Sequence, residues 1–262
     1  MRFIILTLFP EIIDAYFASS IIAKAINKGI IRRKTVNIRD FALDKHKTCD
    51  DAPYGGGPGM LMLAGPIKSA LESVGAVKKT PDNIGNNTSS PQVIYLSPSG
   101  RPFTQKRAEE LAAMEELILV CGRYEGIDQR IIDTYVHEEL SVGDYVLSSG
   151  EAAALVVIDA VYRLIDRVIT PESLVEESFS GGLLEYPQYT RPEIFDTIKV
   201  PEVLLSGHHE NIRRWRLKKR IEKTFALRPE LLERSLREGL FDAETVKFIE
   251  EVRKNNERDQ GD

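Results

Sequence analysis

Three short apolar runs, each followed at once by a loop of Gly, Ser or Pro, constrain the fold of this chain most strongly. The runs span residues 93–96, 117–121 and 142–147, and the loops begin at Ser97, Gly122 and Ser148. Unbroken apolar runs are typical of buried parallel strands. Ligands of α/β sheets bind outside the carboxyl ends of such strands. The pattern therefore predicts a mostly parallel sheet with one ligand pocket at the ends of these strands.

The loops contain neither G-x-G-x-x-G nor G-x-x-x-x-G-K-[ST]. Both motifs hold phosphate at a helix N-terminus. A glycine-lined pocket without them favours a nucleoside-like ligand that lacks phosphate, and S-adenosylmethionine is such a ligand.

The composition is that of a soluble globular protein with one large and one smaller domain, since 42% of the 262 residues are apolar and 29% are charged. Cys49 and Cys121 lie far apart and show no zinc-type spacing, which predicts neither a disulfide framework nor a zinc site and fits a reducing cytoplasm. No apolar run approaches the roughly 20 residues of a membrane span, so no membrane partner is expected.

Residues 1–168 are expected to form the α/β domain. The apolar stretch over residues 3–9 is too short for a signal segment and reads as the first strand. Other expected elements are helical residues over 12–26, a strand over 35–38 and helices over 66–74, 104–114, 127–135 and 151–166. Residues 40–62 are expected to form an ordered surface loop, and the polar residues 78–91 a mobile loop without chemistry.

Beyond this domain the composition changes. Residues 169–182 are expected to be a flexible linker, because residues 170–182 are rich in Pro, Ser, Glu and Gly. Helical spacing over 208–224, 229–238 and 242–254 predicts a small all-helical domain over 183–262.

A local basic run contrasts with the net charge of -5. Between Ser206 and Arg228 there are eight Lys or Arg residues against Glu210 and Glu222. Such an excess is typical of a surface that faces RNA. The more common meaning of a charge run, a solvated helix face, is the alternative.

The loop over residues 50–60 contains four glycines and two prolines, which lets backbone groups approach a planar ligand closely. Together with Asp44-Lys45-His46-Lys47-Thr48 it closely resembles the bacterial tRNA (guanine-N(1)-)-methyltransferase family. That family methylates guanosine 37, on the 3′ side of the anticodon, which supports reading-frame maintenance.

The resemblance extends over nearly the whole chain and includes Gly122-Arg123-Tyr124-Glu125-Gly126, Gly143-Asp144-Tyr145-Val146-Leu147 and Tyr189-Thr190-Arg191-Pro192. It implies an α/β domain with a deep trefoil knot of the SPOUT type, a helical tRNA-binding domain, and a homodimer whose active site is shared between subunits. Knots are nearly absent from other folds, so the periodicity of the sequence would not have suggested one.

The resemblance also implies which residues bind S-adenosylmethionine: Tyr95, Leu96, Ser97, Pro98, Gly122, Tyr124, Val142, Gly143, Tyr145, Leu147 and Gly150. These residues lie at the strand ends described above. The chain departs from the family at Ser148-Ser149-Gly150, where Thr-Gly-Gly is usual. If that glycine position needs a positive φ, Ser149 would be strained.

Methyl transfer to the ring nitrogen 1 of guanine benefits from a base that removes its proton and a cation beside the neighbouring oxygen. By resemblance, the base falls at Glu177, where the family has aspartate, and the cation at Arg163. The extra methylene of Glu177 changes the reach of the carboxylate. Without the family match, Glu177 would be read as a solvated linker acid and Arg163 as a surface arginine.

The carboxylate of Glu125 beside the donor loop is a third candidate catalytic group, with a helix N-terminal acid as the alternative. Cys121 is interpreted as a small buried residue, since methyl transfer from a sulfonium can proceed directly to nitrogen. Magnesium is associated with the family, but no metal-ligand spacing identifies a site. The expected tRNA contacts are Tyr54, Gly55, Gly56, His208, Arg213, Arg214, Arg216, Lys218 and Lys219.

Two other functions remain open at this stage. The first is a related knotted methyltransferase that acts on another RNA nucleotide. The second is a non-catalytic RNA-binding module that keeps the basic helix but has lost catalysis through the changes at Glu177 and Ser149.

Overall fold

The structure, a computed structural model, describes residues 1–80, 91–170, 173 and 176–259. The chain forms two compact units, Met1–Ile169 and Thr170–Asp262, and each is described by itself. Most of the expected mobile loop at 78–91 and part of the expected linker at 169–182 lie outside the described residues. None of the described helices combines the length and the apolar character that a membrane span needs.

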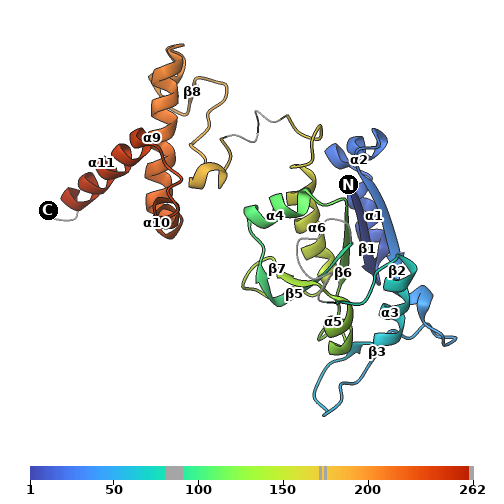
Figure 1. The fold of residues 1–262 in the computed structure, drawn as a ribbon. Coiled ribbons are helices and arrows are strands. Elements are labelled where there is room, and N and C mark those ends of the chain that lie inside the picture. The colour runs from blue at the N-terminus through green and yellow to red at the C-terminus, as the bar shows by residue number, and fades with distance from the viewer. Residues whose placement is uncertain (81–90, 171–172, 174–175, 260–262) are drawn as a thin grey trace. The chain divides into compact units, whose positions relative to one another are not determined.

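The first unit is built on a five-stranded sheet in which every neighbouring pair of strands is parallel (Figure 1). The expected mostly parallel sheet is thus confirmed, and the apolar start of the chain is strand β1. In spatial order the strands are β2 (Arg32–Asn37), β1 (Arg2–Thr7), β6 (Glu116–Cys121), β5 (Gln92–Pro102) and β7 (Glu138–Ser141).

The third apolar run is not a strand, which corrects the expectation for residues 142–147. Strand β7 ends at Ser141, and the apolar run follows it as a loop. Tyr145 is 55% exposed and Val146 is 84% exposed. Burial in the sheet therefore does not explain why these residues are apolar. The true strand begins with Glu138 and Glu139, and these two acids interrupt the apolar pattern by which a buried strand is recognised.

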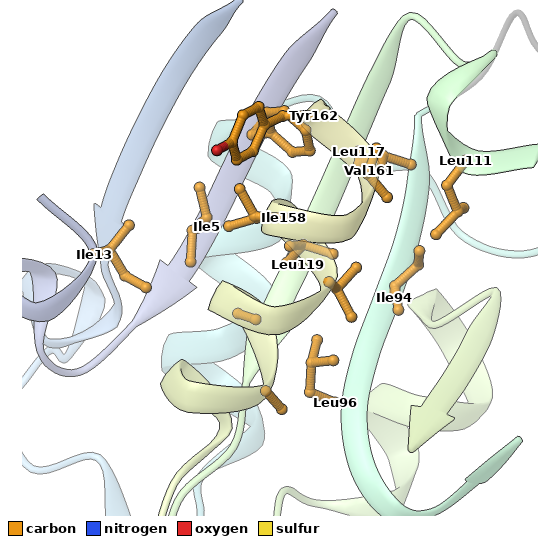
Figure 2. Close-up of a cluster of buried hydrophobic side chains, with 14 of the residues drawn as sticks. Ile5, Ile13, Ile94, Leu96, Leu111, Leu117, Leu119, Ile158, Val161 and Tyr162 are labelled. Atoms are coloured by element: carbon orange, nitrogen blue, oxygen red, sulfur yellow. The ribbon is translucent and has the colours of Figure 1, made fainter. Parts of the chain in front are cut away.

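Helices cover both faces of the sheet. Phe3 and Ile5 of β1 pack into one core cluster, whereas Ile4 and Leu6 pack into the other, because successive side chains of a strand point to opposite faces. Figure 2 shows Ile158 of α6 beside sheet residues of the first cluster. The helices of that face are α1 (Pro10–Phe17), α2 (Ser20–Asn27), α4 (Gln105–Ala112) and α6 (Gly150–Tyr162), and those of the opposite face are α3 (Ala64–Ser73) and α5 (Gln129–Tyr135).

Several boundaries in this unit differ from expectation. Residues 12–26 belong to two helices rather than one, since Ser20 has a φ of 58° where the chain turns. The helix expected to end at 166 ends at Tyr162, with Arg163 as its C-cap. Residues 40–62 are not wholly irregular. They contain the end of a 3-10 helix, η1 (Ile38–Phe41), and the antiparallel pair β3 (Asp50–Asp51) and β4 (Leu61–Met62), which closes the glycine-rich loop.

The second unit is a helical bundle, as expected. Its helices are α9 (His209–Leu227), α10 (Pro229–Arg237) and α11 (Ala243–Asp259), with the short elements η3 (Ser180–Gly182) and α8 (Glu202–Leu205) before them. Leu183, Ile221, Leu232, Ile249 and Val252 form its core. A hairpin of β8 (Ile194–Phe195) and β9 (Ile198–Lys199) was not expected, because two-residue strands are too short to show apolar alternation.

Candidate functional site

A cavity of about 350 Å³ lies at the carboxyl ends of β6 and β7 and beside the middle of β5 in the first unit. Its walls come from three segments, residues 95–99, 122–126 and 140–150. These are the ends of the apolar runs, so the structure brings together what the sequence pattern predicted. All eleven residues expected to hold the methyl donor line this cavity: Tyr95, Leu96, Ser97, Pro98, Gly122, Tyr124, Val142, Gly143, Tyr145, Leu147 and Gly150.

The first segment is a bulge inside β5 rather than a loop after it. The register with β7 shifts between Leu96 and Arg101, so the intervening residues arch away from the ladder. The hydroxyls of Ser97 and Ser99 lie 2.7 Å apart and tie this arch together. A Cβ at Gly100 would lie 2.5 Å from the carbonyl carbon of Glu139, which explains the glycine where the arch passes over β7.

The second segment connects the cavity to the glycine-rich loop. The amide of Glu125 donates to the carbonyl of Met60 at 3.0 Å, and the amide of Met62 donates to the carbonyl of Gly126 at 3.0 Å. The Glu125 side chain lies against Gly59, whose φ of 89° and lack of a Cβ make room for it. Glu125 therefore lines the cavity and also holds the end of the glycine-rich loop.

The third segment passes directly against the second. The amide of Gly150 donates to the carbonyl of Gly122 at 2.8 Å. A Cβ on Gly150 would lie 2.6 Å from the amide nitrogen of Gly122 and 2.8 Å from the Cα of Cys121. Ser149 has φ −162° and ψ 152°, an extended conformation that any residue adopts. The strain considered for Ser149 therefore does not arise.

A buried carboxylate below this crossing was not recognised in the sequence. Glu151, in the first turn of α6, is 0% exposed, and its Oε1 accepts a hydrogen bond of 2.5 Å from Thr7 Oγ1. The sequence does contain a sign of this burial: Glu151 is the one charged residue in the otherwise uncharged run over residues 150–158. Because Glu151 bonds to the end of β1, it holds the start of α6 against the sheet.

Burial alters the chemistry of two groups near the cavity. Burial, with a further contribution from Glu139, raises the pKa of Tyr95 to about 12. Burial, together with the nearby Glu151, raises the pKa of the Cys121 thiol well above its usual range. The raised pKa disfavours the thiolate that a nucleophile needs. Cys121 is fully buried, as expected from the sequence.

The expected catalytic residues do not all meet at this cavity. Glu125 lines it, whereas Arg163 is half-buried at the C-terminal end of α6 and is not among the lining residues. Glu177 is half-buried and belongs to the second unit. The roles of all three residues stay predictions.

Residues 176–182 of the expected flexible linker are held on α9. Glu176 accepts a hydrogen bond of 3.0 Å from the hydroxyl of Tyr186 and pairs with Arg216 at 3.3 Å, and the Arg216 guanidinium lies 4.7 Å from the centre of the Tyr186 ring. Arg216 thus holds a protein carboxylate on this unit. Its side chain is 38% exposed, and its expected contact with tRNA phosphate stays a prediction.

The other expected tRNA contacts lie on exposed surfaces. Tyr54 at the tip of the glycine-rich loop is 100% exposed, Gly55 and Gly56 have open space around them, and His208 is exposed before α9. On α9, Arg213 pairs with Glu210 and Glu244, Arg214 with Glu244, and Lys218 and Lys219 with Glu222. These are solvent-exposed ion pairs, which contribute little to stability and exchange readily with another anion.

No group of three or more His, Cys, Asp or Glu side chains in the described residues could hold a metal ion. The magnesium implied by the resemblance therefore has no recognisable protein site in that part of the chain and stays a prediction.

The parallel sheet and its cavity define a class: α/β proteins that hold a nucleoside-like ligand, without a phosphate loop, at the carboxyl edge of the sheet. Comparison with known families specifies this class further. The chain belongs to the family of tRNA (Guanine-1)-methyltransferase TrmD, whose model matches residues 1–234. This confirms the resemblance seen in the motifs. The family has the knotted SPOUT fold.

Several similar proteins carry the name tRNA (guanine-N(1)-)-methyltransferase. The protein from Treponema denticola is 62% identical over 251 residues, which cover 96% of this chain and 98% of the relative. The one from Borreliella burgdorferi is 60% identical over 226 residues, 86% of this chain and 90% of the relative. The Treponema pallidum protein is 54% identical over 252 residues, 96% of each chain. The similarity thus includes both units.

Proposed function

We propose that this chain transfers a methyl group from S-adenosylmethionine to ring nitrogen 1 of guanosine 37 in tRNA. The observation that carries the proposal is the single cavity lined by all eleven expected donor-binding residues, in a chain of the tRNA (Guanine-1)-methyltransferase family. Methyltransferases in general take their methyl group from S-adenosylmethionine. The guanosine at position 37, rather than another one, is the part of the proposal that rests on the motif resemblance alone.

The cavity fits such a donor in its chemistry. Gly122, Gly143 and Gly150 line the cavity and leave room for a ligand because they have no side chain, and Tyr95 and Leu96 supply apolar surface. The cavity has no Walker-type loop for phosphate, as a donor without phosphate requires. When bound, S-adenosylmethionine supplies an electrophilic methyl group on its sulfonium.

The protein groups would then act on the guanine. Glu177 accepts the proton of nitrogen 1, which leaves that nitrogen nucleophilic, and Arg163 stabilises the negative charge that develops on the neighbouring oxygen. Glu125 contributes negative charge beside the donor. A homodimer whose active site is shared between subunits is also part of the proposal. Magnesium is part of the proposal, as is the cytoplasmic location that a tRNA substrate implies.

The substrate assignment is tested by methyl transfer to two transcripts. Labelled methyl from S-adenosylmethionine should enter a tRNA with guanosine at position 37 and should not enter the same tRNA with adenosine there. Equal labelling of both transcripts would reject position 37 as the target. Nucleoside analysis of the product distinguishes 1-methylguanosine from the product of a knotted methyltransferase that acts on another nucleotide.

The role of Glu177 is tested by Glu177→Gln, which keeps the size of the side chain and removes its basicity. The methyl-transfer rate should fall by about 10²- to 10⁴-fold, the usual contribution of a general base, while donor affinity stays unchanged. The matched control is Glu193→Gln, an exposed glutamate of the same unit, which should retain the wild-type rate. A wild-type rate in Glu177→Gln would exclude Glu177 as the base.

A further inference from the structure

Residues 176–185 form a closed turn around Glu177. The amide of Phe179 donates to the carbonyl of Leu183 at 2.8 Å, and the amide of Ser180 donates to the carbonyl of Glu177 at 3.1 Å. The hydroxyl of Ser178 accepts a hydrogen bond of 3.1 Å from the amide of Glu185. A segment whose composition is typical of a flexible linker therefore has a defined backbone path at the position of the proposed base.

Arg220 of α9 connects the two sides of this turn. Its Nη2 donates to the carbonyl of Ser180 at 2.7 Å, and its Nε donates to the carbonyl of Leu184 at 3.2 Å. Burial lowers the pKa of Arg220, so desolvation of its charge is a cost that the two hydrogen bonds must offset. One turn further along α9, the hydroxyl of Thr224 accepts a hydrogen bond of 2.9 Å from the amide of Leu184.

Arg220 differs in this respect from the other basic residues of α9. Arg213, Arg214, Lys218 and Lys219 pair with carboxylates, as described above, whereas Arg220 bonds to two backbone carbonyls. The carboxylates of Glu176 and Glu185 act on its charge, but its two hydrogen bonds go to carbonyls of the turn. A planar guanidinium with several fixed N–H groups can bridge two such acceptors, which the single ammonium of a lysine cannot do with the same geometry. The contacts of Arg220 therefore serve the conformation of the turn.

We propose that Arg220 is a positioning residue for methyl transfer: it holds the 176–185 turn on α9 and so sets the position of the Glu177 carboxylate. The proposal rests on the proposed role of Glu177 as the base. Proton transfer requires heavy atoms within hydrogen-bonding distance, and a displacement of about 1 Å can lower a rate by about 100-fold. The glutamate at this position is also longer than the family's aspartate, so its backbone must be held to give the carboxylate a defined reach.

Arg220→Lys is the discriminating variant, because it keeps the positive charge and removes the bridge. The methyl-transfer rate with saturating tRNA and donor should fall by about 10- to 100-fold, with donor affinity and tRNA affinity within about twofold of wild type. Lys247→Ala, which removes an exposed charge from α11, should keep the wild-type rate. If Arg220 acted only through its charge toward RNA, Arg220→Lys would have the wild-type rate, and the proposal would be wrong.

A double-mutant cycle separates this proposal from the proposed base. If Arg220 acts through Glu177, Arg220→Lys should cause no further loss of rate in a Glu177→Gln background. Full additivity of the two losses would reject the positioning role and leave the base assignment intact. A wild-type rate in Glu177→Gln alone would instead reject the base.

A second variant covers the case in which Arg220→Lys unfolds the helical unit. Ser178→Ala removes the acceptor for the Glu185 amide and keeps the hydrogen-bonding groups of Arg220 and Thr224 that contact the turn. It should also lower the methyl-transfer rate at saturating substrates, with an unchanged thermal midpoint of unfolding. A rate equal to wild type in this variant would show that the turn need not be held for catalysis and would overturn the proposal.

Discussion

Gly150 lies in close contact with the backbone of another segment of the cavity wall, and its lack of a side chain has a specific cause. The segment that contains it crosses Cys121 and Gly122 so closely that a Cβ would lie 2.6 Å from a backbone nitrogen. Backbone atoms in two packed segments cannot move aside as the end of a flexible side chain can. The glycine is therefore required by space and not by a left-handed φ.

Gly150→Ala should force the two cavity segments apart. We expect a loss of about 1–3 kcal/mol in the free energy of unfolding, the usual cost of overpacking, and a weaker affinity for S-adenosylmethionine. Denaturant unfolding and calorimetric titration measure the two quantities. Gly65→Ala is the matched control: a Cβ at Gly65 in α3 would meet nothing within 4 Å, so stability should stay the same or rise. Wild-type donor affinity in Gly150→Ala would contradict the close packing.

At the scale of elements, His137 connects β7 to β5 just before β7 begins. Its backbone amide donates to the carbonyl of Val93 at 2.8 Å, and its Nδ1 accepts a hydrogen bond of 3.1 Å from the amide of Val93. The ring thus acts as the acceptor of a strand partner, and only a ring with an unprotonated Nδ1 can do so. Burial, with a further contribution from Lys79, lowers the pKa of His137 below its ordinary value of 6.5.

The lowered pKa of His137 predicts that the folded state becomes less stable as the pH falls. The pKa is lower in the folded state, so the unfolded state binds more protons, and stability is lost as the pH falls below 6.5 and through the folded pKa. His137→Asn keeps an acceptor at the same position without titrating. Denaturant unfolding from pH 7 to about pH 5 should therefore show a smaller loss of stability in this variant than in wild type. The control His46→Asn, at an exposed histidine, should follow the wild-type curve.

At the scale of the whole molecule, the basic residues of α9 fall into two groups with different hydrogen-bond and ion-pair partners. Arg216 and Arg220 organise the segment that contains Glu177, whereas four others remain at the surface in exposed ion pairs. The net charge of the whole chain is -5, although Lys and Arg exceed Asp and Glu on α9. Attraction of a polyanion depends on exposed cations, and each of these four side chains can exchange its carboxylate for a phosphate.

Replacement of the exposed group by glutamine should therefore weaken tRNA binding and reduce its salt dependence. Each lost phosphate contact lowers the slope of log K against log salt by about 0.7–0.9, so the full variant should lose up to about 3. The rate at saturating tRNA should stay near wild type. The residues replaced are Arg213, Arg214, Lys218 and Lys219, and the control replaces Arg234, Arg237, Lys247 and Lys254 of the same unit. An unchanged slope would reject contact with phosphates and favour the alternative that the basic run is a solvated helix face.

The arrangement of the first unit could be predicted largely from the sequence. Parallel strands are buried on both faces, so β1, β5 and β6 appear as unbroken apolar runs, and the glycines after them mark the edge where a ligand approaches. These signals are local and depend on short spacing, which is why the edge that carries the cavity could be predicted without coordinates. The family resemblance then implied the individual donor-binding residues and the candidate catalytic residues.

Other features depended on contacts between residues that are far apart in the sequence. Apolar residues at 142–147 line the cavity and do not belong to the sheet. The buried carboxylate of Glu151 accepts a hydrogen bond of 2.5 Å from Thr7, which lies 144 positions earlier in the chain. The 176–182 segment has the composition of a linker but is held by side chains about 40 residues further along the chain, on α9. The sequence by itself determined that β1, β5 and β6 are buried strands and that glycines follow them at the cavity edge. Only the tertiary structure decided which acceptor each arginine binds, because a hydrogen bond depends on distances that spacing along the chain does not encode.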